Sequence, residues 1–179
     1  MRVISGKYRG KKLISPINDN VRPTTDKVKE CVFNMLQFDI VDSNFLDLFS
    51  GSGAIGIEAI SRGAEHVTMV DNSKDSLKVI KQNLSNIEGN FTILEKDYES
   101  AIKCTNKKYD IVYLDPPYIF NDIDKMLDLL HMNNVLNLNA IIVYESLYES
   151  NKKANNENYI LQKSKKYGTI CVDTYLYKG

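Results

Sequence analysis

The sequence predicts an α/β protein built on a doubly wound, mostly parallel β-sheet. Two observations carry this prediction. Short apolar strands alternate with amphipathic helices between residues 45 and 144, which is the pattern of parallel strands joined by crossover helices. Two further strands follow each other directly at 159–165 and 169–177, joined at Tyr167-Gly168. Because no helix separates them, we expect an antiparallel strand pair at one edge of the sheet.

Each element of the alternating part is either a short apolar run or a segment with apolar residues at helical spacing. The strands are expected at 45–49, 67–70, 91–94, 111–114 and 140–144. The helices are expected at 54–62, 73–86, 98–104 and 122–131. An earlier helix is expected after Thr24-Thr25, because a threonine hydroxyl can cap it and apolar residues recur from Val28 to Leu36.

The first residues form a separate small unit in this prediction. Residues 2–15 are basic and β-leaning around Gly6 and Gly10, which indicates a short β-hairpin. We therefore divide the chain into an N-terminal basic β-hairpin appendage, residues 1–20, and a main domain, residues 21–179.

The composition is that of one globular domain. The chain has 179 residues, 43% hydrophobic and 26% charged, so it can bury a core without disulfides. No apolar run approaches the roughly 20 residues of a membrane span, and residues 1–8 lack the apolar core of a signal peptide. Cys31, Cys104 and Cys171 have no metal-ligand or redox spacing. We expect a cytoplasmic monomer with reduced cysteines and no metal.

The charge is unevenly distributed although its sum is zero. Residues 1–30 contain eight Lys and Arg residues against three acids, which is +5, and the remainder of the chain carries −5. A segregated basic end favours a polyanion such as RNA as the partner. The candidate RNA contacts are Arg2, Lys7, Arg9, Lys11, Lys12 and Arg22. A solvated charged hairpin is the alternative interpretation.

A glycine-rich loop follows the strand at 45–49 and opens a helix. Gly51, Gly53 and Gly56 have the spacing G-x-G-x-x-G, which lets a ligand approach the backbone closely. Asp71 ends the next strand, 20 residues after Gly51, where a dinucleotide-binding fold places the acid that holds a ribose. The glycine spacing alone therefore does not exclude a nicotinamide cofactor.

Two other acids favour S-adenosylmethionine. Asp47 precedes the glycine loop, where a carboxylate can hold an ammonium group but would repel a pyrophosphate. Asp97 ends the third strand and can accept a hydrogen bond from an adenine amine. The residues predicted to bind the cofactor are Asp47, Phe49, Ser50, Gly51, Ser52, Gly53, Asp71, Asn72, Asp97 and Tyr98. The alternatives are a turn partner for Asp47, a solvated strand-end acid for Asp71 and a helix N-cap for Asp97.

The tetrapeptide Asp115-Pro116-Pro117-Tyr118 directly follows the strand at 111–114. Ligands of open α/β sheets bind outside such strand ends. The carboxylate of Asp115 and the carbonyl of Pro116 can accept hydrogen bonds from an exocyclic amine, and the Tyr118 ring can stack on a flat base. The two prolines fix the backbone and remove two N–H donors. These four residues are the predicted catalytic site; a strand-ending turn with a stacked tyrosine is the alternative.

With these motifs the sequence resembles, over nearly its whole length, the bacterial 16S ribosomal RNA guanine-N2 methyltransferase family (RsmD-like). The family-specific part is MRVISGKYRGKKL, residues 1–13, together with RPTTDKVKE, residues 22–30. LDLFSGSG, residues 46–53, and DPPY, residues 115–118, belong to the wider superfamily. Members of the family often have Glu where this chain has Asp71, and either carboxylate can hold ribose hydroxyls.

The resemblance implies a Rossmann-like fold that transfers a methyl group from S-adenosylmethionine to a guanine N2 of 16S ribosomal RNA. It also implies that the substrate is a partly assembled 30S particle. The target base must be unpaired or flipped out of its helix, because a stacked base cannot reach the tetrapeptide.

Three other functions remain as alternatives at this stage. An adenine-N6 methyltransferase acting on DNA or RNA would also use the tetrapeptide, although the chain has no room for a separate target-recognition domain. A nicotinamide-dependent oxidoreductase would use the glycines and Asp71 but leaves the tetrapeptide unexplained. A non-catalytic RNA-binding module would have lost Asp115 or the glycines, and both are present.

Overall fold

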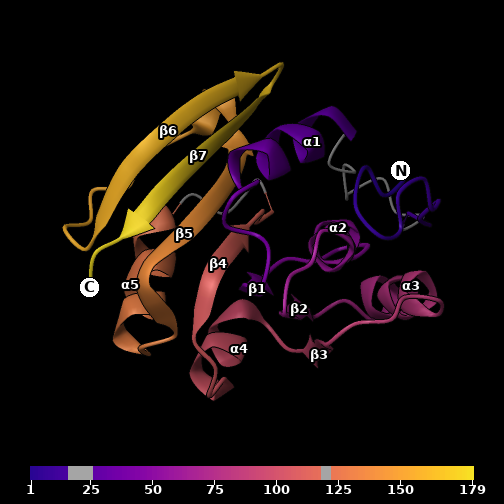
Figure 1. Ribbon diagram of the computed structural model, residues 1–179. Helices are drawn as coiled ribbons and strands as arrows, with labels where there is room; N and C mark the ends of the chain where they lie inside the picture. The colour runs from indigo at the N-terminus through magenta and orange to yellow at the C-terminus, as the bar shows by residue number, and fades with distance from the viewer. Residues whose placement is uncertain (16–25, 118–121) are drawn as a thin grey trace.

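The computed structural model describes residues 1–15, 26–117 and 122–179, and in this part of the chain seven strands form one sheet (Figure 1). The strand order across the sheet is β3-β2-β1-β4-β5-β7-β6. The strands are β1 (Asn44–Asp47), β2 (His66–Asp71), β3 (Phe91–Glu95), β4 (Tyr109–Leu114), β5 (Leu136–Leu147), β6 (Tyr159–Tyr167) and β7 (Ile170–Tyr177). β1 to β5 are parallel, and β7 pairs antiparallel with both β5 and β6. The doubly wound sheet and its antiparallel end are therefore confirmed.

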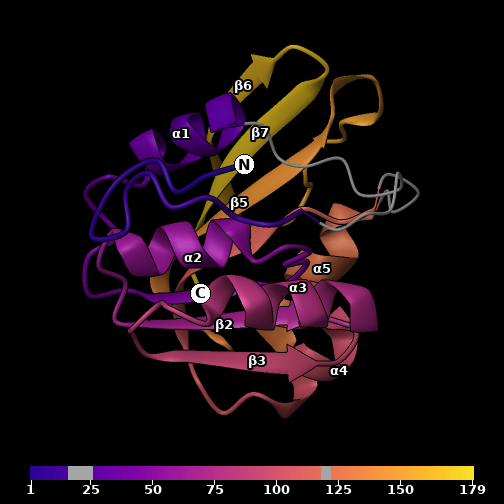
Figure 2. The same ribbon diagram turned by 90° about the vertical axis from the view of Figure 1, so that its right-hand side faces the viewer.

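Five α-helices cover the two faces of the sheet in the described residues. They are α1 (Asp26–Met35), α2 (Ala54–Ser61), α3 (Lys74–Leu84), α4 (Tyr98–Cys104) and α5 (Ile123–Met132), and a short 3-10 helix η1 (Tyr148–Ser150) follows β5. Buried side chains of α1, α2 and α3, such as Val32, Ile57 and Ile80, share one core. Ile102 of α4 and Leu127 of α5 belong to a second core cluster, and these two helices lie on the other face of the sheet (Figures 1 and 2). No helix among the described residues has the length and apolar character needed to cross a membrane.

β5 begins at Leu136, four residues before the apolar run that predicted it. Leu136 is buried and pairs with Tyr109 of β4, and the register then shifts before the regular pairing resumes at Ile141. Leu138 and Asn139 are exposed, and Asn139 has a φ of 66°. Because this irregular segment interrupts the apolar pattern, the sequence signal starts only at Ala140.

The amino end reverses direction as predicted, but it does not form two regular strands. One antiparallel bridge joins Arg2 and Lys12. Gly6 and Gly10 have φ values of 82° and 86°, and a Cβ on Gly6 would lie 1.7 Å from the carbonyl oxygen of Ser61. The backbone between these glycines forms turns and contacts α2, so its hydrogen bonds are not available for a strand ladder.

Residues 1–15 share the main core. Val3 and Leu13 are buried in the same cluster as α1 and α2. Asn83 of α3 accepts a hydrogen bond from the Ile14 amide at 2.8 Å and donates to the Ile14 carbonyl at 3.0 Å. The predicted division at residue 20 and the predicted threonine cap before α1 both lie outside the described residues.

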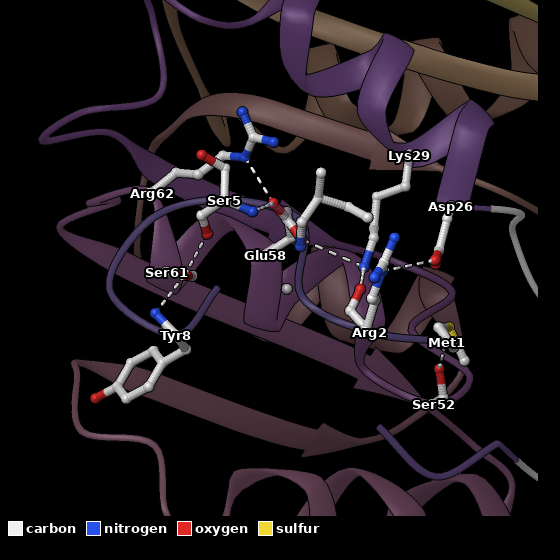
Figure 3. A network of polar contacts seen from close by, with 12 residues as sticks. Met1, Arg2, Ser5, Tyr8, Asp26, Lys29, Ser52, Glu58, Ser61 and Arg62 are labelled. Carbon is white, nitrogen blue, oxygen red and sulfur yellow. Dashed lines mark hydrogen bonds and ion pairs between the residues drawn. The ribbon is translucent and has the colours of Figure 1, made fainter. Parts of the chain in front are cut away.

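A buried ionic network fastens this segment to α1 and α2 (Figure 3). Glu58 of α2 and Lys29 of α1 have fully buried side chains, and Lys29 Nζ lies 3.3 Å from Glu58 Oε2. Arg62 Nε donates to Glu58 Oε1 at 2.7 Å. The amides of Ile4 and Ser5 donate to the two carboxylate oxygens at 2.8 and 3.0 Å. Every oxygen of this buried carboxylate therefore has donors, as a charge removed from water requires.

The ammonium of Lys29 also holds the amino-terminal segment. It donates to the carbonyl oxygen of Arg2 at 2.5 Å. Burial lowers the pKa of Lys29, while the carboxylate of Glu58 acts in the opposite direction. One lysine therefore links three parts of the chain that are distant in sequence: residues 1–5, α1 and α2.

We expect Lys29→Met to lower the free energy of unfolding by about 3 kcal/mol, because removing one partner of a buried ion pair leaves the other charge poorly compensated. Urea denaturation followed by circular dichroism measures this change. Lys27→Met is the matched control: Lys27 is an exposed lysine of the same helix, and its replacement should change stability by less than about 0.5 kcal/mol. Equal effects of the two variants would contradict a structural role for the network.

Candidate functional site

The predicted site residues gather at the carboxyl ends of β1, β2 and β4. Asp47 and Asp71 are the last residues of β1 and β2, and Asp115 follows the last residue of β4. Asp47 pairs in register with Met69 on one side and Tyr113 on the other. Neighbouring parallel strands therefore deliver three carboxylates to one edge, where ligands of doubly wound sheets bind.

Ser50 connects the beginning of the glycine loop to β2 by hydrogen bonds. Its amide donates to the carbonyl of Val70 at 2.9 Å, and its hydroxyl accepts from the Val70 amide at 3.0 Å. The same hydroxyl donates to the carbonyl of Asp47 at 2.9 Å. Ser50 was predicted to touch the cofactor; in this structure its buried side chain holds the loop in shape.

The glycines of the loop meet two different requirements. Gly51 and Gly53 have φ values of 53° and 76°, in the left-handed region that other residues rarely adopt. Gly53 is also the residue before α2, whose N-terminus has no side-chain cap. A Cβ on Gly56 would lie 2.6 Å from Met69 Cγ, so this glycine lets α2 pack closely on β2.

Asp71 fixes the loop from the opposite side. Its Oδ2 accepts from the Gly51 amide and its Oδ1 from the Ser73 amide, both at 2.8 Å. A carboxylate oxygen has two lone pairs, so the half-buried side chain retains acceptor capacity towards ribose hydroxyls. Asn72, the next residue, is exposed at the same strand end.

The carboxylate of Asp47 is only partly satisfied. The residue is 1% exposed, and its Oδ2 accepts one long hydrogen bond, 3.3 Å, from the Gly56 amide. Its Oδ1 is buried and has no hydrogen-bond partner among the residues that the structure describes. Burial raises the pKa of Asp47 to about 7, and the nearby carboxylate of Asp71 adds to the effect. Buried polar atoms are rarely left without a partner, so this oxygen fits a ligand that brings a hydrogen-bond donor, such as an ammonium group.

The remaining predicted cofactor contacts occupy several places around this edge. The rings of Phe49 and Tyr98 pack 5.5 Å apart at an interplanar angle of 39°. Ser52 is buried; its carbonyl accepts from Asn83 at 2.9 Å, and its hydroxyl lies 3.8 Å from the sulfur of Met1.

Asp97 is the N-cap of α4, which was the alternative to the predicted adenine contact. Its Oδ1 accepts from the Ser100 amide at 2.9 Å and its Oδ2 from the Ser100 hydroxyl at 2.8 Å, so it caps α4. These hydrogen bonds, the amide first, hold the pKa of Asp97 below its usual value. Contact with an adenine amine remains a prediction.

The predicted catalytic tetrapeptide continues from β4. Asp115 is half-buried, Pro116 is buried and Pro117 is exposed. Tyr118 lies outside the described residues. The strand therefore brings the carboxylate and the following carbonyl to the same edge as Asp47, as the sequence predicted.

Two buried residues beside the tetrapeptide, Tyr113 and Glu145, were not predicted from the sequence. The Tyr113 hydroxyl donates to the Glu145 carboxylate, and both side chains are almost fully buried. Burial raises the pKa of Tyr113 well above its usual value, and the carboxylates of Glu145, Asp115 and Asp47 raise it further. The phenol thus lies within electrostatic reach of both the cofactor acid and the tetrapeptide acid. The available signal was Glu145 itself, an acid that directly follows the apolar run of residues 140–144.

Of the predicted RNA contacts, Lys7 and Arg9 belong to a turn that lies away from this edge. Arg2 pairs with Asp26 at 3.4 Å and Lys7 with Glu88 at 2.8 Å. The turn of residues 6–10 lies against Ser61 and Glu88, which precede β2 and β3, so it is at the opposite end of the strands from Asp71 (Figure 2). Arg9, Lys11 and Lys12 make no ion pair within the described ranges. Arg22 lies outside them.

Groups of acids, histidines and cysteines that could hold a metal ion are absent from the described residues. The functional groups that the described residues bring to this edge include carboxylates, a buried phenol and backbone groups. This donor set suits a cationic organic ligand beside a flat amine.

Comparison with known proteins identifies the family of this chain. The family model described as "Conserved hypothetical protein 95" matches residues 1–176. Ribosomal RNA small subunit methyltransferase D of Escherichia coli is 34% identical over 176 residues, which are 98% of this chain and 89% of that protein. The protein of the same name from Haemophilus influenzae is 36% identical over 181 residues, covering 98% of this chain and 93% of that protein.

A solved structure gives the same result for the fold. The yhhF protein of Escherichia coli superposes with a TM-score of 0.89 at 32% identity, covering 99% of this chain and 98% of that chain. The match includes the amino-terminal segment as well as the sheet. The chain therefore belongs to the family described as conserved hypothetical protein 95, the RsmD-like family that its motifs resemble.

Proposed function

We propose that this protein transfers a methyl group from S-adenosylmethionine to the exocyclic N2 of a guanine in small-subunit ribosomal RNA. The observation that carries the proposal is the pairing of two acids at adjacent strand ends. Asp47 is a buried carboxylate with one oxygen that lacks a partner in the described chain, and Asp115 begins a proline-stiffened loop on the neighbouring strand. The names of the relatives support ribosomal RNA as the substrate.

The residues present fit S-adenosylmethionine. Asp47 would hold its ammonium group, because that group brings the donor that Oδ1 lacks. Asp71 would accept the ribose hydroxyls, and the backbone of Gly51 to Gly53 would lie against the methionine part. When bound, S-adenosylmethionine supplies a methyl group activated by the positive charge on its sulfur.

Asp115 would act on the acceptor amine. The lone pair of guanine N2 is delocalised into the ring, which makes the amine a poor nucleophile. Asp115 and the Pro116 carbonyl would accept its two hydrogens and favour a tetrahedral nitrogen. As positive charge develops on the nitrogen, the carboxylate stabilises it more than it stabilises the ground state. Positioning of the amine next to the methyl group contributes most of the remaining rate acceleration, because the effective molarity of well-placed reactants is worth up to about 7–11 kcal/mol of the barrier.

The finer parts of the function follow from the same proposal. The protein acts in the cytoplasm as a monomer, and its substrate is a partly assembled 30S particle in which ribosomal proteins present the target loop. The contact of Asp97 and Tyr98 with adenine, and of Tyr118 with the target base, belongs to the proposal as well.

The decisive experiment identifies the modified base. The protein is incubated with methyl-labelled S-adenosylmethionine and 16S ribosomal RNA, 30S particles or DNA, and the product is digested to nucleosides. We expect N2-methylguanosine from ribosomal RNA or 30S particles and no label in DNA. N6-methyladenine as the product would overturn the choice of guanine, and an absence of transfer to all three would overturn the function.

Replacement of Asp115 should separate chemistry from cofactor binding. We expect Asp115→Ala to lower kcat by about 10²–10³-fold, the usual cost of removing a group that stabilises transition-state charge. Calorimetric titration should give an unchanged Kd for S-adenosylmethionine. Asp115→Asn keeps one acceptor oxygen without the charge and should lose less. If Asp115→Ala abolishes both transfer and cofactor binding, the residue is structural.

Asp47 should make cofactor binding depend on pH. Its carboxyl has a pKa of about 7 in the folded protein, so lowering the pH from 8 to 6 protonates it and removes the charge that would hold the ammonium. We expect the Kd for S-adenosylmethionine to rise by about tenfold over this interval. Asp47→Asn should bind weakly at both pH values. An equally steep dependence in Asp47→Asn would assign the titration to another group.

The raised pKa of Asp47 also makes the stability of the protein depend on pH: the charge that favours cofactor binding at high pH lowers the free energy of unfolding there. The pKa of Asp47 is higher in the folded protein than in the unfolded chain. Its contribution to the free energy of unfolding is therefore complete below about pH 4, the pKa of an unfolded Asp, and is lost as the pH rises through about 7. We expect Asp47→Asn to be more stable than the wild type at pH 8 by about 4 kcal/mol, since folding raises the pKa by about 3 and each pKa unit is worth about 1.4 kcal/mol, and similar to it at pH 4. Asp39→Asn, an exposed control, should show no such difference. Chemical denaturation at the two pH values measures it.

A further inference from the structure

A basic surface lies at the end of β6, at the same edge of the sheet as Asp115. The pairing register places it there. Leu114 at the end of β4 pairs with Tyr144 of β5, and three residues further along, Leu147 pairs with Ile170 of β7. Ile170 in turn pairs with Tyr167, the last residue of β6. Because β5 runs parallel to β4, the carboxyl end of β6 lies at the same edge as Asp115.

The distance between the two sites follows from the strand order. β6 is the third strand beyond β4, in the order β4-β5-β7-β6. Strands lie about 4.8 Å apart, so the end of β6 is displaced by roughly 14 Å across the sheet. A nucleotide held at Asp115 would therefore have neighbours of its own strand near β6.

The chain from η1 to the turn between β6 and β7 is positively charged. Residues 148–169 contain five lysines, Lys152, Lys153, Lys163, Lys165 and Lys166, against two acids, Glu149 and Glu157, which gives +3. Lys163, Lys165 and Lys166 are exposed. None of the three pairs with an acid in the described part of the chain.

An aromatic ring lies next to one of these lysines, Lys166. Tyr148 of η1 is 49% exposed, and the ammonium of Lys166 lies 3.4 Å from the centre of its ring. The Tyr148 amide donates to the Thr169 carbonyl at 2.8 Å, which ties η1 to the turn between β6 and β7. The ammonium of Lys166 covers one face of the ring. A base that stacked on this face would take the place of the ammonium, which could then contact the phosphate of the same strand.

Buried contacts hold this surface in a fixed shape. Asp173 of β7 is fully buried and accepts from Lys153 Nζ at 2.5 Å and from Asn151 Nδ2 at 2.8 Å. Asn151 also donates to the Ser146 hydroxyl at 2.7 Å. The segment after η1 is thereby fastened to β5 and β7, so a ligand would not have to order it on binding.

We propose that Tyr148, Lys165 and Lys166, here called the β6 rim, bind the RNA strand next to the nucleotide that is modified at Asp115. This inference rests on the proposed function and adds the surface that holds the substrate. It moves the main RNA contact away from the turn of residues 6–10, which lies at the opposite edge. A basic edge strand also resists pairing with other sheets, but that role accounts for the lysines and not for the exposed ring beside them.

The test compares two lysine pairs. Lys165→Gln/Lys166→Gln removes two charges from the β6 rim. Lys107→Gln/Lys108→Gln is the matched control, because these two exposed neighbours precede β4 and lie at the opposite edge. The affinity for 16S ribosomal RNA is measured by fluorescence anisotropy between 50 and 200 mM salt. We expect the rim variant to reduce the slope of log K against log salt by about 1.4, at roughly 0.7 for each single-strand phosphate contact, and the control to keep it.

Tyr148→Ala tests the ring separately. Loss of one stacked base should weaken RNA binding by about tenfold and leave the salt slope nearly unchanged. Cofactor affinity should be the same in all variants. Equal salt slopes for the rim variant, the control and the wild type would overturn the β6 rim while methyl transfer by the wild type still supported the proposed function. An aggregating rim variant whose monomeric fraction binds RNA with the wild-type slope would also overturn it, because the lysines would then serve the sheet edge.

Discussion

The site depends on one constraint: a carboxylate buried at the end of the first parallel strand. Asp47 lies between β2 and β4 in the sheet, below a glycine loop that Ser50 and Asp71 hold in shape. Burial makes its negative charge costly, and in the described part of the chain its Oδ1 has no hydrogen-bond partner while its Oδ2 accepts a long hydrogen bond from the Gly56 amide. The protein thus keeps a polar atom in an unfavourable state at the position where a cationic ligand is proposed to bind, which is typical of functional sites.

The buried acid of α2 shows the contrast. Glu58 is as deeply buried as Asp47, but two cations and two backbone amides surround it. Its contacts join the amino-terminal segment to two helices and leave no oxygen for a ligand. Glu58 therefore holds the fold together, whereas Asp47 is available to a ligand. The sequence alone does not distinguish these two buried acids.

Periodicity predicted most of the fold, because apolar runs report burial directly. The order of strands and helices from β1 to β7 and the position of Asp47, Asp71 and Asp115 at one edge followed from it. The early start of β5 was missed because exposed residues interrupt its pattern, and the irregular amino end was missed because its backbone bonds to α2. Tyr113, Glu145 and Lys29 were missed because their partners come from other elements, and a single sequence does not show which elements meet.

The amino-terminal segment has a consequence for how the protein folds. Its contacts join residues that are far apart along the chain: Ile4 with Glu58, Tyr8 with Ser61, and Ile14 with Asn83. Closing such long loops carries an entropic cost that must be met before the contacts form. We therefore expect residues 1–15 to dock onto α2 and α3 after these two helices have formed. Asn83 donates to the carbonyl of Ile14 in this segment and to the carbonyl of Ser52 in the glycine loop, so we expect docking of the segment and ordering of the loop to be coupled.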